Sequence, residues 1–117
     1  MDDVELKRRT KQFALRVMKL VTALPLDTIG KTIGTQLVRS ATSVGANYRA
    51  ACRGRSKAEF IAKLQIVIEE ADEFCYWLDL IIEGALLPES KVALLLDEAN
   101  QLTAIKVASR KSSQSRP

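Results

Sequence analysis

Three arginines close together are the residues of this sequence best suited to bind an anion. Arg49, Arg53 and Arg55 fall within one seven-residue stretch. A guanidinium group keeps its charge at any physiological pH and donates several hydrogen bonds, so such a cluster suits phosphate groups. The cluster raises the question of whether the chain binds a polyanion such as RNA or DNA.

The sequence offers little for catalysis or metal binding. Its 117 residues include no histidine, so the commonest general base at neutral pH is missing. Two cysteines, Cys52 and Cys75, make a poor zinc site without histidine and are expected to be small buried hydrophobes. Glycine-rich loops that cradle nucleotide phosphates are absent. We therefore expect a protein that is not an enzyme, binds no metal and needs no cofactor.

Composition favours a single soluble domain with a basic balance. The formal net charge is +4 and the isoelectric point is about 9.3, which permits a nucleic-acid partner without establishing one. No apolar run reaches the roughly 18 residues of a membrane span, and no signal-peptide core follows the acidic N-terminus. We expect a cytoplasmic protein with no membrane contact.

Four amphipathic helices account for the hydrophobic pattern. Apolar residues recur every three or four positions over residues 4–24, 28–53, 57–83 and 89–110. Asp27 or Thr28 is a good cap for the second helix, whose apolar stripe starts at Ile29, and Ser56 with Glu59 forms a capping box for the third. Pro25 is expected to end the first helix and Gly84 the third.

Short linkers between these helices predict the arrangement of the fold. Two to four residues suffice only to join antiparallel neighbours, so we expect an all-α, up-down-up-down antiparallel four-helix bundle over residues 1–111. Residues 112–117 are polar, basic and without periodicity, and we expect a flexible tail there.

Positive charge gathers on the first and second helices, on the tail and at the corner between the second and third helices. Residues 26–55 hold five Lys or Arg and one acid, whereas residues 56–87 hold two Lys or Arg and seven acids. On a helical wheel, four cations of the second helix lie within about 80° of one another, opposite its apolar side. The predicted phosphate-binding residues are Lys31, Arg39, Arg49, Arg53 and, at the corner, Arg55. The competing interpretation is a solvated polar face that pairs with acids of a neighbouring chain.

The third helix has a second apolar strip outside its core side. Ile66, Trp77 and Leu80 share this strip with Glu73. An outward tryptophan is typical of an interface between chains, so these four residues are the predicted oligomer contact. The alternative is that Trp77 lies along its own helix, half shielded from water.

Small residues interrupt the second helix. Ser40, Ser43 and Asn47 lie at the flank of its core side, and Gly45 is a poor helix former whose presence we attribute to close packing. We expect them to let a neighbouring helix approach closely, with Asn47 bonding across to it. Their predicted role is helix packing.

Three blocks of the sequence carry a family resemblance. "LVRSATSVGANYRAA", "AEFIAKLQIVIEEADEFCYWLDLI" and "DEANQLTAIKVASRK" together resemble the four-helix-bundle proteins encoded by intervening sequences of bacterial 23S rRNA genes, also called S23-type ribosomal proteins. That family is similar in architecture to the accessory protein of diversity-generating retroelements, a pentamer that engages nucleic acid and a reverse transcriptase.

The resemblance implies partners rather than chemistry. It implies a homopentamer that binds RNA or DNA through a basic surface. The alternative function is a protein-interaction adaptor, for example a partner of a reverse transcriptase or another mobile-element protein, without nucleic-acid specificity of its own.

Overall fold

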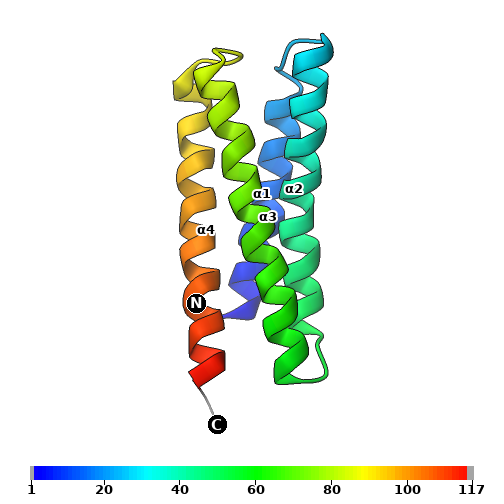
Figure 1. Cartoon of the computed structure of the whole chain (residues 1–117), viewed down its shortest axis with the longest axis vertical. Helices are drawn as coiled ribbons and strands as arrows, with labels where there is room; N and C mark the ends of the chain where they lie inside the picture. Colours follow the sequence, from blue (N-terminus) through cyan, green and yellow to red (C-terminus); the bar gives the residue numbers. More distant parts are fainter. Residues whose placement is uncertain (1, 116–117) are drawn as a thin grey trace.

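The computed structural model describes residues 2–115, with the side chains of residues 2–113, and contains four antiparallel helices (Figure 1). They are α1 (Asp3–Val21), α2 (Thr28–Cys52), α3 (Lys57–Glu83) and α4 (Glu89–Ser115). The chain runs up, down, up and down, so α1 begins in the same half of a 50 × 20 × 20 Å rod as the α2–α3 turn. The all-α four-helix bundle predicted from the sequence is confirmed.

Side-chain caps fix the starts of three helices. Asp2 accepts a hydrogen bond from the Glu5 amide at 2.8 Å, and Asp27 accepts one from Gly30 at 2.8 Å. Ser56 accepts the Glu59 amide at 3.1 Å, as the capping box predicts. The Glu59 carboxylate reaches back to the amide of Arg55, one residue before the cap, at 2.6 Å. These caps satisfy amides that have no partner within the helix.

The first helix ends three residues earlier than expected. After Val21 the backbone tightens into turns in which Ala23 donates to Leu20 and Leu24 donates to Val21. Because Pro25 disfavours helical backbone in the residue before it, the last turn cannot remain α-helical. Gly30 then allows α2 to pack on the turn, since a Cβ there would lie 1.9 Å from the Pro25 carbonyl oxygen.

The third helix ends at the predicted glycine, but the strained position is the next residue. Gly84 is the C-cap, and Ala85 adopts the left-handed conformation with φ of 55°. Ala85 donates to the Ile82 carbonyl at 3.1 Å and Leu86 to Ile81 at 3.0 Å, which is the Schellman pattern. A glycine would adopt this φ without strain, so the alanine costs stability here.

The core runs along the whole bundle axis. Phe13 of α1 and Phe74 of α3 meet edge to face at its centre, with ring centroids 4.8 Å apart. The predicted stripe of α2 is buried from Ile33 to Tyr48, but Ile29 is 60% exposed, so the expectation for this residue was wrong. Ile29 lies in the first turn of α2, where the helix begins before it reaches the neighbouring helices.

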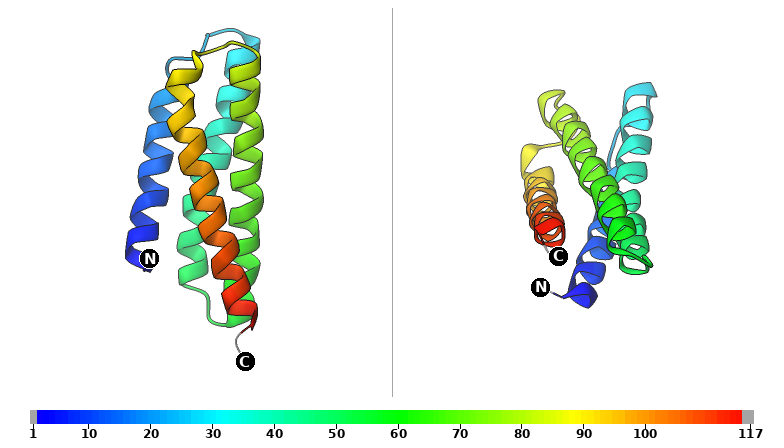
Figure 2. Two further views of the ribbon diagram at one scale, coloured as in Figure 1. Left: turned by 90° about the vertical axis from the view of Figure 1, so that its left-hand side faces the viewer. Right: turned by 60° about the horizontal axis from the view of Figure 1, so that its bottom comes forward.

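The last helix is longer than expected and packs mainly on α3, with less contact to α1, from which it diverges toward its own C-terminal end (Figure 2). It continues to Ser115 rather than ending at residue 110, so the helix includes part of the predicted tail. Residues 116 and 117 of that tail lie outside the described part of the chain. Arg9 of α1 joins α4 through an ion pair with Glu98 and a hydrogen bond to Gln101 at 3.2 Å.

Candidate nucleic-acid interface

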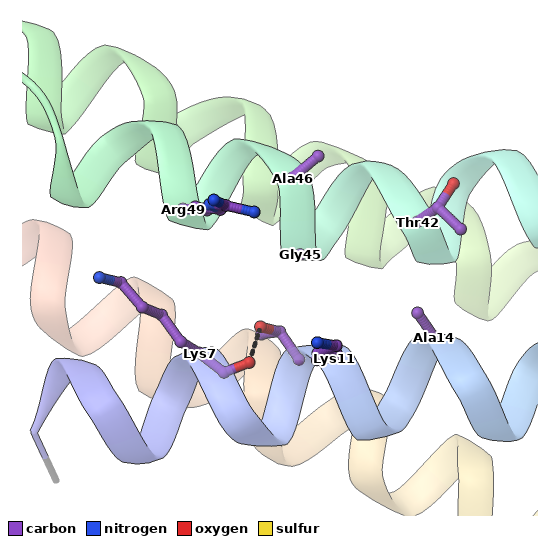
Figure 3. A pocket seen from close by; sticks show the side chains of 8 residues that line it. Lys7, Lys11, Ala14, Thr42, Gly45, Ala46 and Arg49 are labelled. Atoms are coloured by element: carbon purple, nitrogen blue, oxygen red, sulfur yellow. Dashed lines mark hydrogen bonds between the residues drawn. The ribbon is translucent and has the colours of Figure 1, made fainter.

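A groove between α1 and α2 brings together cations from both helices (Figure 3). It has a volume of about 400 Å³ and lies between the N-terminal half of α1 and the C-terminal half of α2, which are neighbours because the helices are antiparallel. Three cationic, two hydroxyl and three small residues line it: Lys7, Lys11, Arg49, Thr10, Thr42, Ala14, Gly45 and Ala46. Only Arg49 among the three cations was predicted as a phosphate contact.

The three cations of the groove stand on opposite walls. Lys7 and Lys11 are one turn apart on α1, about 6 Å along the axis, and Arg49 faces them from α2 (Figure 3). All three are exposed, and none forms an ion pair with another residue in the described part of the chain. The lining includes no acidic residue, so the positive charge of the groove is not neutralised.

Hydroxyl groups of the groove are already engaged in the helices. Thr10 is buried and donates its hydroxyl hydrogen to the Lys7 carbonyl at 3.1 Å, and Thr42 donates to Val38 at 2.7 Å. Their oxygens have little left to offer an anion, because an anion needs donors. Attraction for a negative ligand therefore comes from the three cations.

Arg39, one of the predicted phosphate contacts, is committed to α3 instead. Its guanidinium group lies 3.0 Å from Glu70 and also pairs with Glu73, and its Nε donates a hydrogen bond to Gln36 Oε1 at 2.9 Å. The hydrogen bond from Arg39 lowers the pKa of Glu73 and raises the pKa of the arginine itself. Sequence alone did not show this, because the register between α2 and α3 decides which acids meet the arginine.

Lys31 is far from the groove although it shares the same side of α2. It is 18 positions before Arg49, which is about 27 Å along a helix. It lines a separate groove beside the α1–α2 turn, whose other lining residues include Val21, Leu26 and Val38. Lys31 thus has apolar neighbours rather than other cations.

The corner arginines form a third cationic position. Arg53 and Arg55 are exposed and line a hollow of about 340 Å³ between α2 and α3 together with Lys63. Glu59 also lines this hollow, so its charge is partly neutralised. The five predicted cations therefore lie at four different places. Arg49 lines the groove, Arg39 pairs with acids of α3, and Lys31 is distant from both. Arg53 and Arg55 lie together at the corner.

The three predicted packing residues behave differently from one another. Asn47 donates to the Ser43 carbonyl at 3.0 Å and to its hydroxyl at 2.9 Å, both in its own helix, so the expected bond across to a neighbour was wrong. Gly45 lies beside Thr10 of α1, but an added Cβ would be 3.6 Å from the nearest atom, an ordinary contact. Close packing therefore does not require glycine at position 45.

The second strip of α3 lies partly against the protein rather than pointing outward. Trp77 and Leu80 are half-buried and pack on the core, and Trp77 meets the exposed Tyr76 edge to face at 5.2 Å. This matches the half-shielded alternative for Trp77. Glu73 pairs with Arg39, and Ile66 remains 37% exposed. The oligomer contact stays a prediction, with Ile66 its most exposed predicted apolar member.

A buried lysine escaped the sequence reasoning. Lys106 of α4 is fully buried, and its Nζ lies 3.2 Å from the centre of the Tyr48 ring without a hydrogen-bond partner in the described residues. Burial lowers the pKa of Lys106 to about 8, while the ring face attracts the charged form. The Tyr48 hydroxyl donates to Asp3 at 3.2 Å, and burial raises the pKa of Tyr48.

The spacing of α4 contained the signal for this lysine. The buried positions Val92, Leu95, Ala99 and Leu102 alternate by three and four residues, and Lys106 is the next in the series. Residue type was the misleading cue, because lysine is almost never fully buried. Its aliphatic stem fills the layer between α4 and α2 while the amine rests on an aromatic face.

Metal and thiol chemistry find little support in the described residues. Within residues 2–113, His, Cys, Asp and Glu side chains form no group of three that could hold a metal ion. Cys75 is half-buried with its sulfur 3.7 Å from Asn100, and burial raises its pKa to about 11, which keeps it protonated and unreactive. None of the helices in the described part is both long and apolar enough to cross a membrane.

Comparison with protein families identifies the relatives of this bundle. Residues 2–108 match the 23S rRNA-intervening sequence protein family. The chain belongs to that family. The resemblance of the three sequence blocks to the 23S rRNA-intervening sequence protein family is thus confirmed.

A solved member of the S23 ribosomal protein family has the same architecture. The crystal structure of this Bacteroides thetaiotaomicron protein, whose function is unknown, superposes with a TM-score of 0.85 at 30% identity. The alignment covers 91% of this chain and 98% of the other. No curated protein matches the chain. The S23 fold is thus shared over nearly the whole length.

Proposed function

We propose that this 23S rRNA-intervening sequence protein binds nucleic acid through the basic surface of α1 and α2, without catalysing a reaction. The observation that carries the proposal is the groove that Lys7, Lys11 and Arg49 line, with no acidic residue in the lining. Phosphate neutralisation releases condensed counterions, so cations left without an internal partner are the ones able to contribute affinity.

The distribution of acids supports this choice of surface. Exposed acids lie on α3, where Glu69, Asp72, Asp79 and Glu83 form an outward row. A polyanion would be repelled from α3 and attracted to α1 and α2. The family name links the protein to intervening sequences of 23S rRNA, which makes RNA the first polyanion to test and the cytoplasm the expected location.

A salt series tests the proposal directly. We expect the purified chain to bind a labelled 23S rRNA fragment at low salt, with the logarithm of the binding constant falling linearly against the logarithm of salt concentration. Unrelated RNA of equal length should bind with similar affinity, because phosphate contacts do not read bases. An absence of binding at low salt, or binding that does not respond to salt, would contradict the proposal.

We also propose that the chain assembles into a homo-oligomer, with a ring of five as the expected form. The acidic row of α3 has no ion-pair partner among the described residues, and a separate groove between α1 and α4 presents Arg16, Lys19 and Lys91. Contact between these two surfaces on neighbouring copies would close head to tail. It would also leave the α1–α2 groove open.

Light scattering tests the assembly. The expected mass is a multiple of the 13.0 kDa chain, and the double variant Glu69→Lys, Asp72→Lys should lower it by placing like charges in contact. A monomeric mass at micromolar concentration would contradict the ring. The alternative function, a protein-interaction adaptor, stays a prediction.

A further inference from the structure

Gly45 has no packing reason to be glycine. An added Cβ would lie 3.6 Å from the Thr10 carbonyl oxygen, whereas the same atom would lie 1.9 Å from Pro25 at Gly30 and 3.0 Å from Val21 at Gly34. Glycine inside a helix weakens it relative to alanine. The missing side chain at position 45 therefore lowers the stability of α2 without relieving a clash.

Because Gly45 has no side chain, it helps to keep the α1–α2 groove open. It lies on the side of α2 that faces α1, opposite Ala14, whereas the exposed Ala46 stands at the rim of the α1–α2 groove and points away from α1 (Figure 3). A longer side chain at position 14 or 45 would enter the space between the two helices, and one at position 46 would narrow the groove at its rim. The small residues thus keep open a hollow that the bundle itself does not need.

We propose that this groove holds the phosphodiester backbone of a nucleic-acid strand, with Lys7, Lys11 and Arg49 around the phosphates and Gly45 and Ala14 beneath them. The inference rests on the proposed nucleic-acid function and assigns its binding position. The fork of an arginine matches two phosphate oxygens, while the lysines act as point charges on the other wall.

The chemistry of the lining favours a phosphodiester over an acidic peptide. Peptide grooves rely on apolar or aromatic pockets that anchor side chains. This groove contains alanines, a glycine and threonines, and no large apolar residue. Its walls recognise charge and leave the bases unread, so RNA and DNA strands of one sequence should both bind.

A substitution that adds bulk without changing charge distinguishes binding in the groove from binding through the overall positive charge of the protein. Ala46→Leu adds an isobutyl group at the rim of the groove, and Ala104→Leu adds the same group at an exposed position of α4 as the matched control. The probes are a short labelled single-stranded RNA and the DNA of the same sequence. We expect Ala46→Leu to weaken binding of both probes at least fivefold at 0.1 M salt, about one phosphate contact, and Ala104→Leu to match the wild type.

Gly45→Ala adds a readout that a purely structural glycine would not give. Since the Cβ fits without a clash, the variant should melt at the same or a higher temperature than the wild type and yet bind the RNA more weakly. A lower melting temperature with unchanged affinity would overturn the inference. Circular dichroism of every variant confirms that the four helices are retained.

The outcomes distinguish the inference from the proposed function. If the Ala46→Leu variant binds the probes as tightly as the wild type does, the groove assignment is wrong, and nucleic-acid binding by other cations remains. A complete lack of salt-dependent binding by the wild type overturns both. Polyglutamate that competes for the groove as well as RNA does would assign it to an acidic peptide and overturn the phosphodiester.

Discussion

Arg39 and Arg49 lie on the same helix and have opposite surroundings. Arg39 faces α3 and is held by Glu70 and Glu73, whereas Arg49 faces α1 and shares a groove with two lysines. The residue type and the helix are the same, so the neighbouring helix decides the role. A paired arginine contributes to the bundle, and an unpaired arginine among cations is available to a ligand.

The largest expected effect comes from removing the whole groove charge. The triple variant Lys7→Ala, Lys11→Ala, Arg49→Ala should lose about 100-fold in affinity for single-stranded RNA at 0.1 M salt, because each lost phosphate contact weakens binding about fivefold. Fluorescence anisotropy measures this. Lys111→Ala, which removes an exposed cation near the C-terminal end of α4, serves as the charge control. If it lowers RNA affinity as much as each groove substitution does, the groove cations are not special.

Lys106 extends the comparison to a cation beneath the surface. Lys106→Met keeps the volume of the side chain and removes a buried amine that has no hydrogen-bond partner. We expect the free energy of unfolding at pH 7 to rise by about 1–3 kcal/mol, since an apolar replacement of a buried charge is often stabilising. Urea denaturation measures it, and a loss of stability would mean that the contact with the Tyr48 ring outweighs the burial cost.

The difference in free energy of unfolding between the wild type and Lys106→Met should depend on pH. The pKa of Lys106 is about 8 in the folded state against 10.5 as its ordinary value. Between these pH values the unfolded chain binds more protons than the folded chain, so the free energy of unfolding rises with pH, by up to about 3 kcal/mol. The advantage of Lys106→Met should therefore shrink from pH 8 to pH 10.5. A constant advantage across this window would contradict the buried charge.

The smallest expected effect separates stability from binding. Ala85→Gly relieves a left-handed backbone at the α3–α4 turn, away from both arginines. We expect the free energy of unfolding to rise by about 0.5–1 kcal/mol while RNA affinity stays the same. Thermal melting and anisotropy on one preparation check both, and a change in affinity would mean that binding follows global stability rather than the groove.

Much of the fold was predictable because its signals are local. Caps such as Asp27 and Ser56 act within one turn, and the apolar spacing sets which side of each helix is buried. The end of α1 was placed three residues too late, because the effect of Pro25 on the backbone before it was not taken into account. Sequence predicted elements well where the cause lies within a few residues of the effect.

The site was less predictable because it depends on register between helices. The wheel of α2 placed Arg39 and Arg49 together, but only the neighbouring helices separate them. Lys7 and Lys11 belong to α1, and nothing in their own helix indicates that they face Arg49. Lys106 occupies a core position that its residue type concealed.

The salt dependence of RNA binding by Arg49→Ala and Arg39→Ala tests the central claim most directly. Each variant removes one arginine from α2, so their charge changes are matched. We predict that Arg49→Ala lowers the slope of the logarithm of affinity against the logarithm of salt by about 0.7 for a single strand, while Arg39→Ala leaves it unchanged. Equal decreases in slope, or a larger decrease for Arg39→Ala, would contradict the assignment of phosphate binding to Arg49 rather than to the paired Arg39.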